Sequence, residues 1–354
     1  MHRTLTFAPL HLLRRLDPET AHALALGAIR LGLAGRPNVA VDPILQVAVF
    51  GLEFRNPIGL AAGFDKNGAA IDGLARLGFG FLETGTVTPR AQSGNPRPRV
   101  FRLEEDGAVI NRLGFNNSGL DAYLERLASR TTRTVPIGAN VGINRDHADP
   151  ERDYPALVEA VTKEADYIVV NVSSPNTADL RSWQSPPRLE TLLRSIATVR
   201  RPTRPLLLKV SPDLAEGELE ALIEICISGG VQGLILTNTT VARPETLRSR
   251  FRDELGGLSG APLFAPSTAM LARAFELARG RMKLIGVGGV RSGRDALMKI
   301  QAGAHLVQLY TAFAYGGADL LHRALDELAA ELQKRGFKSV EEAVGSDARR
   351  LARS

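Results

Sequence analysis

Short apolar segments recur along the chain from about residue 58 to residue 310, and each is followed by a stretch with helical periodicity. They begin near Ile58, Phe81, Pro136, Tyr167, Leu206, Gly233, Lys283 and His305. The segments are continuously apolar rather than alternating, which is typical of parallel strands buried on both faces. Eight strand–helix units within about 250 residues predict an α/β fold of the TIM (β/α)8 barrel type.

A doubly wound α/β sheet is the structural alternative. Its dinucleotide fingerprint, G-x-G-x-x-G, is absent, because Arg291 occupies the last position after Gly286 and Gly288. The glycine-rich stretch fits better as the phosphate site of a barrel, where the loops after the seventh and eighth strands present backbone N–H groups. The barrel is therefore favoured, with a phosphate as the candidate ligand of this loop.

The two ends of the chain depart from the repeating pattern. Leu5–Leu16 predicts a short amphipathic helix, and Asp17-Pro18 supplies an N-cap and a first-turn proline for a second helix. An extended link around Val39–Phe54 leads to the first strand. We therefore expect a two-helix head in residues 1–40, a barrel in residues 41–340, and a basic tail in residues 341–354 that frays from residue 345.

Two spacings between successive apolar segments are longer than the others. One runs from Phe81 to Pro136 and the other from Gly233 to Lys283. Because the active sites of barrels lie at the carboxyl ends of the strands, we expect these spacings to hold loops over the barrel mouth.

The positive charge is distributed unevenly. Lys and Arg exceed Asp and Glu by 44 to 38, and half of this excess lies in residues 1–36. A basic segment predicts an anionic partner, either a nucleic acid or a lipid surface. Aromatic residues make up 5% of the chain and do not interleave with the basic runs, so no nucleic-acid partner is expected.

Several functional classes are disfavoured by what the sequence lacks. No apolar stretch reaches the ~20 residues that span a bilayer, and Arg14 and Arg15 interrupt any signal-peptide core. The single cysteine, Cys226, cannot form an intramolecular disulfide, and its helix-like surroundings favour a packing role. The six histidines have no metal-ligand spacing, so no metal site is expected.

Amides, hydroxyls and lysines gather where the apolar segments end. Lys209 ends a core strand, where a fixed cation would favour the reduced state of a flavin. With the phosphate loop, this predicts FMN as a cofactor. The serines of residues 171–177 have no histidine beside them, so a serine-protease triad is not supported, although a serine could relay a proton.

Four asparagines share these strand ends with a lysine. Amide groups pair with imide edges, and a lysine pairs with a carboxylate. A small, flat, anionic ligand is therefore predicted for Asn111, Asn171, Asn176, Asn238 and Lys66.

Nine motifs in order resemble dihydroorotate dehydrogenase from about residue 17 to residue 314. They are IGLAAGFDKNG (58–68), ETGTVTPR (83–90), NRLGFNNSG (111–119), NVSSPNT (171–177), LLLKVSPDL (206–214), LTNTT (236–240), GGLSGAPL (256–263), GVGGV (286–290) and VQLYTAF (307–313). The basic head and the DPETAH stretch (17–22) are similar to those of class 2, the membrane-associated, quinone-reducing type.

The resemblance implies oxidation of dihydroorotate to orotate in pyrimidine biosynthesis, with Ser174 as the catalytic base. Class 1 relatives use a cysteine as the base, and Cys226 cannot take that place. The cofactor-binding residues implied are Ala62, Gly63, Phe64, Asp65, Lys66, Thr86, Asn140, Asn171, Lys209, Thr237, Gly260, Gly289, Tyr310 and Thr311. The substrate residues implied are Lys66, Asn111, Arg112, Leu113, Gly114, Phe115, Asn171, Asn176, Asn238 and Thr239.

Class 2 membership implies ubiquinone or menaquinone as the electron acceptor, and a monomer bound peripherally to the cytoplasmic face of the inner membrane. Two rival functions stay open on the residues alone. One is another FMN barrel enzyme, such as a 2-hydroxy-acid oxidase, which would need a histidine base that the strand ends lack. The other is a membrane-recruited flavin- or nucleotide-binding module without turnover, against which the set of asparagines argues.

Overall fold

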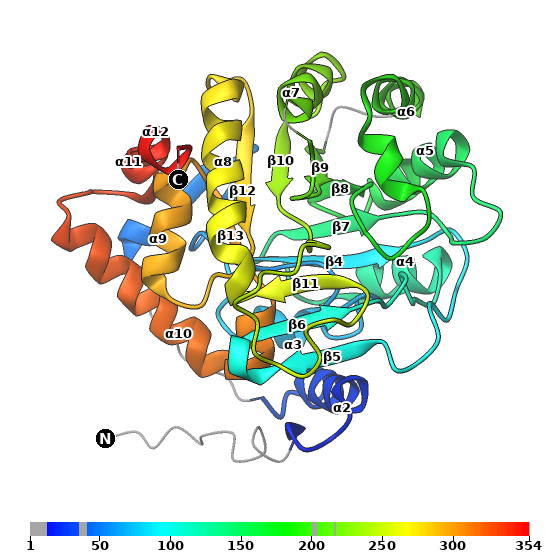
Figure 1. Ribbon diagram of the computed structural model, residues 1–354, viewed down its shortest axis with the longest axis horizontal. Coiled ribbons are helices and arrows are strands. Elements are labelled where there is room, and N and C mark those ends of the chain that lie inside the picture. The colour runs from blue at the N-terminus through cyan, green and yellow to red at the C-terminus, as the bar shows by residue number, and fades with distance from the viewer. Residues whose placement is uncertain (1–12, 35–40, 200–203, 216, 354) are drawn as a thin grey trace.

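Eight parallel strands close into a barrel at the centre of the molecule (Figure 1). The computed structural model describes residues 13–34, 41–199, 204–215 and 217–353. In chain order the barrel strands are β3 (Ile58–Leu60), β4 (Phe81–Val87), β7 (Ile137–Val141), β8 (Tyr167–Asn171), β9 (Leu206–Val210), β10 (Gly233–Leu236), β12 (Lys283–Val287) and β13 (Leu306–Leu309). Strand β13 pairs with β3 and closes the ring. The TIM barrel prediction is confirmed, and the doubly wound sheet is excluded.

Burial on both faces explains why the strands are continuously apolar. Every residue of β7, β8 and β9 is buried, because one face packs inside the barrel and the other against helices. Bulky side chains fill the interior, so some neighbours must be small. A Cβ on Gly59 would lie 2.4 Å from Cζ of Phe81.

An outer layer of helices surrounds the barrel (Figure 1). It comprises α3 (Ile71–Ala75), α4 (Leu120–Ser129), α5 (Pro150–Val161), α6 (Pro186–Val199), α7 (Glu218–Ser228), α8 (Phe264–Ala278), α9 (Gly293–Gln301) and α10 (Thr311–Lys334). Cys226 is fully buried on α7, as its predicted packing role requires.

The two long spacings between strands form one structure rather than separate loops. Strands β5 (Val100–Leu103) and β6 (Ala108–Asn111) come from the first spacing, and β11 (Gly257–Gly260) comes from the second. They pair as an antiparallel sheet in the order β11-β6-β5. This sheet has its own small core, and it lies between the barrel and α2 in Figure 1.

Helix α2 (Pro18–Arg30) confirms the second helix predicted for the head. The carboxylate of Asp17 accepts hydrogen bonds from the backbone N–H groups of Glu19 and Thr20, and Pro18 occupies the first turn. The other predicted helix, 5–16, lies almost entirely outside the described residues. In the described residues, no helix combines the length and the apolar composition needed to cross a bilayer.

The predicted extended link contains regular structure. It has a short 3-10 turn, η1 (Pro43–Leu45), and an antiparallel hairpin of β1 (Val47–Val49) and β2 (Leu52–Phe54). Phe50, at the hairpin turn, lies beside Gly233 at the start of β10. The hairpin therefore covers the amino ends of the strands, opposite the barrel mouth.

The prediction of a frayed tail was wrong. Helices α11 (Val340–Ala343) and α12 (Ala348–Leu351) pack on the barrel's outer helices, with Ala348 and Leu351 buried. The backbone N–H of Gly345 donates to the carbonyl of Ile300 at 3.0 Å. Basic composition suggested an exposed tail, but the apolar residues between the arginines fasten it to α8 and α9.

Candidate active site

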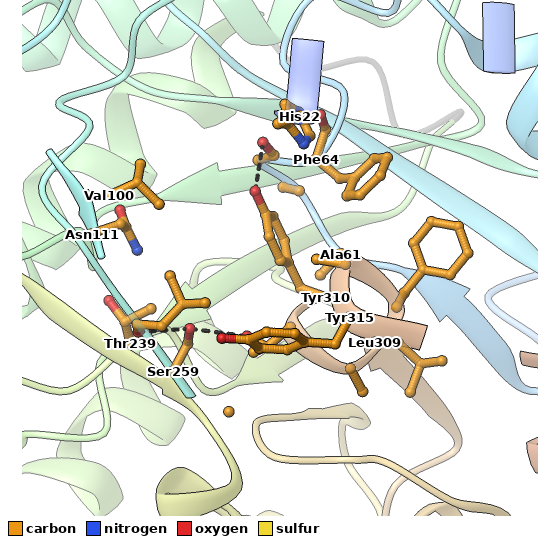
Figure 2. A pocket seen from close by; sticks show the side chains of 18 of the residues that line it. His22, Ala61, Phe64, Val100, Asn111, Thr239, Ser259, Leu309, Tyr310 and Tyr315 are labelled. Carbon is orange, nitrogen blue, oxygen red and sulfur yellow. Dashed lines mark hydrogen bonds between the residues drawn. The ribbon is translucent and has the colours of Figure 1, made fainter. Parts of the chain in front are cut away.

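A cavity of about 770 Å³ opens at the carboxyl ends of the barrel strands (Figure 2). Most of the residues predicted to bind cofactor or substrate line it. They are Ala62, Gly63, Phe64, Lys66, Thr86, Asn111, Leu113, Gly114, Phe115, Asn171, Ser174, Asn176, Lys209, Thr237, Asn238, Thr239, Gly260, Gly289, Tyr310 and Thr311. Residues separated by more than 200 positions in the sequence therefore meet in one chamber.

Asp65 and Asn140 are buried behind the cavity wall rather than on it. The carboxylate of Asp65 accepts hydrogen bonds from the backbone N–H groups of Ala69 and Ala70, at 2.8 and 2.7 Å. Burial raises the pKa of Asp65, although those hydrogen bonds pull the pKa in the opposite direction. Asp65 thus holds the loop that carries Lys66 in place.

Arg112 is directed away from the cavity. Its guanidinium donates to a carboxylate oxygen of Glu254 at 2.8 Å and to the carbonyl of Leu255 at 3.0 Å. It also lies over the ring of Phe101, 4.6 Å from the centroid. Arg112 therefore joins the two insertions that carry β5, β6 and β11. Its side chain contacts other protein groups rather than the cavity.

Beneath the cavity lies a floor network of four buried polar side chains: Glu83, Asn140, Lys209 and Gln308. The Glu83 carboxylate accepts from Nδ2 of Asn140 at 2.7 Å and from Nε2 of Gln308 at 2.5 Å. Its Oε1 lies 3.9 Å from Nζ of Lys209. The network compensates the Lys209 charge and fixes its position, since a buried cation is stable only when paired.

Sequence reasoning missed Glu83 and Gln308. Both lie in the motifs ETGTVTPR and VQLYTAF, but neither lies at the end of a strand, where the functional side chains are expected. The sequence does contain a signal for them, because each is an ionisable or amide side chain within a buried strand. Such a side chain must point into the barrel or into the helix layer, where it needs a polar partner.

Above the floor, the asparagines hold one another in position. Nδ2 of Asn171 donates to Oγ1 of Thr86 at 3.0 Å, and that hydroxyl donates to Oδ1 of Asn140 at 2.5 Å. Nδ2 of Asn238 donates to Oγ of Ser173 at 2.9 Å. Because these contacts fix the amide orientations, the remaining polar atoms are presented to the cavity in defined directions.

Ser174 lies on the loop after β8 and is 6% exposed. Its Oγ accepts a hydrogen bond from the backbone N–H of Asn176 at 3.2 Å. Within the described residues, no imidazole or carboxylate is hydrogen-bonded to this hydroxyl. Ser174 is therefore placed to exchange a proton but depends on water or another hydroxyl to carry it away.

Arg181 holds the loop of Ser174 against its neighbours. Its Nε donates to the carbonyl of Ser173 at 3.0 Å, and one terminal nitrogen donates to the carbonyl of Thr239 at 2.9 Å. The other terminal nitrogen forms an ion pair with Asp213 at 2.7 Å. The loops after β8, β9 and β10 are thus joined through one guanidinium.

Lys66 places a positive charge at the cavity wall. Its Nζ donates to the carbonyl of Gly63 at 2.8 Å. Desolvation lowers the pKa of Lys66 to about 8, although the negative charges of Glu19 and Asp65 act in the opposite direction. Lys66 is consequently protonated near neutral pH, and an anionic ligand would satisfy its charge.

The cavity continues toward α2, where Ala21 and Ile29 line it together with Glu19 and His22. His22 of α2 lies 2.8 Å from the carbonyl of Phe64 through Nε2, and burial lowers its pKa to about 4. His22 is therefore neutral at physiological pH. Figure 2 shows His22 and Phe64 on one side of the cavity and Thr239 and Ser259 on another, with Tyr310 between them. Sequence reasoning did not identify His22 as a cavity residue.

The loop after β12 has the features of an anion cradle. Gly288 and Gly289 have positive φ angles of 113° and 73°, and in the described part of the chain neither backbone N–H has an acceptor. A Cβ on Gly289 would lie 2.5 Å from Cβ of Phe264, so a larger residue would not fit. Consecutive amides without an acceptor, in a cavity that Thr311 at the start of α10 also lines, fit a phosphate group.

Comparisons with known proteins agree with this geometry. The model of the dihydroorotate dehydrogenase family matches residues 44–332. A dihydroorotate dehydrogenase (quinone) of Azorhizobium caulinodans is 49% identical over 341 residues, which are 94% of this chain and 96% of the relative. The mitochondrial dihydroorotate dehydrogenase (quinone) of Mus musculus is 50% identical over 349 residues, 95% of this chain and 88% of the relative.

A solved structure is also similar over nearly the whole chain. The dihydroorotate dehydrogenase of Eimeria tenella in complex with ferulenol superposes with a TM-score of 0.90 at 38% identity, covering 96% of this chain and 99% of that one.

Proposed function

This chain belongs to the dihydroorotate dehydrogenase family, and we propose that the cavity at its barrel mouth is the active site of the quinone-dependent reaction. The enzyme oxidises dihydroorotate to orotate, in pyrimidine biosynthesis, with a flavin as redox group and a quinone as electron acceptor. The single observation that carries the assignment is the convergence of Ser174, the asparagines and Lys66 on one chamber beside an anion cradle.

FMN is the flavin. A flavin supplies hydride acceptance from carbon and onward transfer of the electrons to a quinone. The cradle at Gly288 and Gly289 suits a terminal monophosphate, and Lys209 provides a fixed cation inside the barrel. The residues that would hold the cofactor are Ala62, Gly63, Thr86, Asn171, Lys209, Thr237, Gly260, Gly289, Tyr310 and Thr311.

Ser174 takes the proton from C5 of dihydroorotate while hydride leaves C6. Its low exposure keeps bulk water from the substrate carbon, and the Asn176 N–H directs the hydroxyl. Because serine is a weak base, the proton continues to water or a hydroxyl as it is transferred. Arg181 positions this loop through the Ser173 carbonyl.

Lys66 binds the substrate carboxylate, and the asparagines bind the amide edges of its ring. Asn111, Asn171, Asn176 and Asn238 offer both donors and acceptors, which match alternating N–H and C=O groups. The protein contacts that fix these amides restrict the substrate to one orientation, which contributes to the rate through positioning.

The head brings the quinone to the cavity from a membrane surface. Leu24, Leu31 and Leu33 are 54%, 75% and 67% exposed on and just after α2, and the exposed Arg30 directly precedes Leu31. Exposed leucines beside arginines suit a peripheral helix that inserts into the lipid interface. The enzyme acts as a monomer on the cytoplasmic face of the inner membrane, with ubiquinone or menaquinone as acceptor.

An anaerobic half-reaction experiment tests this function. Purified protein with its flavin is mixed with dihydroorotate in the absence of a quinone, and the visible flavin absorption is recorded. We expect bleaching that a quinone reverses and NAD does not. A flavin that stays oxidised would contradict the substrate, and reversal by NAD would contradict the acceptor.

A further inference from the structure

Lys299 is a fully buried lysine that the reaction described above does not use. It lies on α9, and its Nζ donates to Oγ of Ser267 at 2.6 Å. The carbonyl of Phe264 is 3.5 Å away, and the ring centroid of Phe264 is 5.1 Å away. No carboxylate among the described residues lies within ion-pair distance. Lys209, by contrast, has Glu83.

Ser267 contacts the back of the anion cradle, and Lys299 lies behind Ser267. The Ser267 hydroxyl donates to the carbonyl of Leu263 at 2.6 Å and also lies 3.3 Å from the carbonyl of Gly288. The Lys299 Cβ lies 3.3 Å from the position of a Cβ on Gly286, in the strand that leads to the cradle. The C=O and N–H of a trans peptide point in opposite directions. The Gly289 N–H is therefore directed away from Ser267, toward the cavity that Gly289 lines.

We propose that Lys299 is the counter-charge of the flavin phosphate, acting from behind the cradle without touching the ligand. This inference rests on the proposed function, in which a phosphate occupies the cradle. The ammonium and Ser267 hold the 288–289 peptide so that its amide faces the phosphate. The phosphate in turn adds negative charge to that of Asp295, which acts on Lys299 from beyond ion-pair distance.

The physical reason is the cost of burying an unpaired charge. A buried ammonium without a carboxylate destabilises the fold, and burial lowers the pKa of Lys299 well below its usual value. A bound anion on the other side of a thin backbone loop offsets that cost. Lys299 is therefore a positioning residue. It lowers the stability of the flavin-free protein and raises the affinity of the cradle for a phosphate.

The test compares flavins with and without the phosphate. For the full-length chain and its Lys299→Met variant, dissociation constants of FMN and riboflavin are measured by flavin fluorescence. We expect Lys299→Met to weaken FMN binding about tenfold and to change riboflavin binding less than about twofold. Equal weakening of both flavins, or no change in either, would overturn the proposal.

Unfolding of the flavin-free chain provides a second readout. Removing an uncompensated buried charge should leave the melting temperature of flavin-free Lys299→Met equal to or above that of the parent chain. A lysine that only stabilises the fold would give the opposite result, a lower melting temperature.

Two further variants keep the test decisive. Lys283→Met removes the same charge from an exposed position on β12 and should leave the preference for FMN unchanged. Ser267→Ala keeps the ammonium but removes its link to Gly288, and it should also reduce the preference for FMN. If Lys299→Met does not fold, a normal preference in Ser267→Ala overturns the proposal.

Flavin binding by the parent chain distinguishes failure of the FMN assignment from failure of the Lys299 assignment. If it binds riboflavin as tightly as FMN, the assignment of FMN itself is wrong. If it prefers FMN and Lys299→Met keeps that preference, only the assignment of Lys299 fails.

Discussion

The two ends of the cavity are built differently. The inner end, above the floor network, is made by strand ends, and its polar side chains are fixed by partners on neighbouring strands. The outer end is made by α2, with apolar residues and a neutral His22, and leucines beside it are exposed. The inner end suits oxidation of the substrate and the outer end suits entry of the quinone. The two half-reactions should therefore respond to different substitutions.

Ser174→Ala should produce the largest difference between the effects of a substitution on the two half-reactions. Loss of the base should slow flavin reduction by dihydroorotate by about 10²- to 10⁴-fold, while re-oxidation of the reduced flavin by a quinone keeps its rate. Anaerobic stopped-flow spectroscopy measures both. Ser182→Ala, on the same connection but outside the cavity lining, is the matched control. A normal reduction rate in Ser174→Ala would remove the serine from the mechanism.

Glu83→Gln tests whether the floor network stabilises the inner end. The neutral amide presents a donor where three donors converge, and it leaves Lys209 buried without its counter-charge. We expect the free energy of unfolding to fall by about 3 kcal/mol, measured by urea denaturation. Glu224→Gln breaks the exposed ion pair with Arg281 and should leave the free energy of unfolding almost unchanged. Equal losses of stability in the two variants would show that Glu83 stabilises the fold no more than an exposed ion pair does.

The outer end is tested by substituting Leu31 and Leu33 with aspartate. Each leucine buried in lipid contributes about 1.5–3 kcal/mol, so affinity for vesicles should fall by at least about tenfold. Sedimentation with anionic vesicles measures binding, and flavin reduction by dihydroorotate should be unchanged. Leu255→Asp is the control, because Leu255 is 79% exposed on an insertion far from α2 in the sequence. Equal loss in both would mean that α2 is not the membrane contact.

The smallest expected effect is a pH dependence confined to the inner end. Lys66 has a pKa of about 8 in the free enzyme. It is charged below this pH and neutral above it, so carboxylate binding is present at low pH and is lost as the pH rises. We expect kcat/KM for dihydroorotate to lose about half its Lys66-dependent part between pH 7 and pH 8.

The oxidative half-reaction with the quinone should lack this dependence on Lys66. In Lys66→Met, the lower kcat/KM should no longer fall through the same pH range. A fall that persists in the variant would assign the titration to another group.

Much of the architecture could be predicted from local patterns. Continuous burial of eight segments identified the barrel, and Asp17-Pro18 placed the start of α2 within one residue, because caps and buried strands depend on neighbours along the chain. Strand ends meet at one edge of any barrel, so the positions of Lys209 and Asn238 at the cavity followed from the fold class alone.

Other features were decided only by the tertiary structure. The pairing of β6 with β11 joins segments about 150 residues apart, and nothing in either segment specifies the other. The tail packs through Ala348 and Leu351, although its composition is that of an exposed segment. Arg112 lies in a motif with cavity residues and Asn140 lies near the carboxyl end of a barrel strand, but both side chains bind other partners.

The sequence by itself thus determined which segments form strands and which residue types reach the barrel mouth, because those depend on periodicity and on position along a strand. Only the closed barrel decided that Glu83 compensates Lys209 while Lys299 is left with a hydroxyl. The reason is that the partner of a buried charge depends on which distant side chains the fold brings within a few ångströms, and that distance is not encoded in any local pattern.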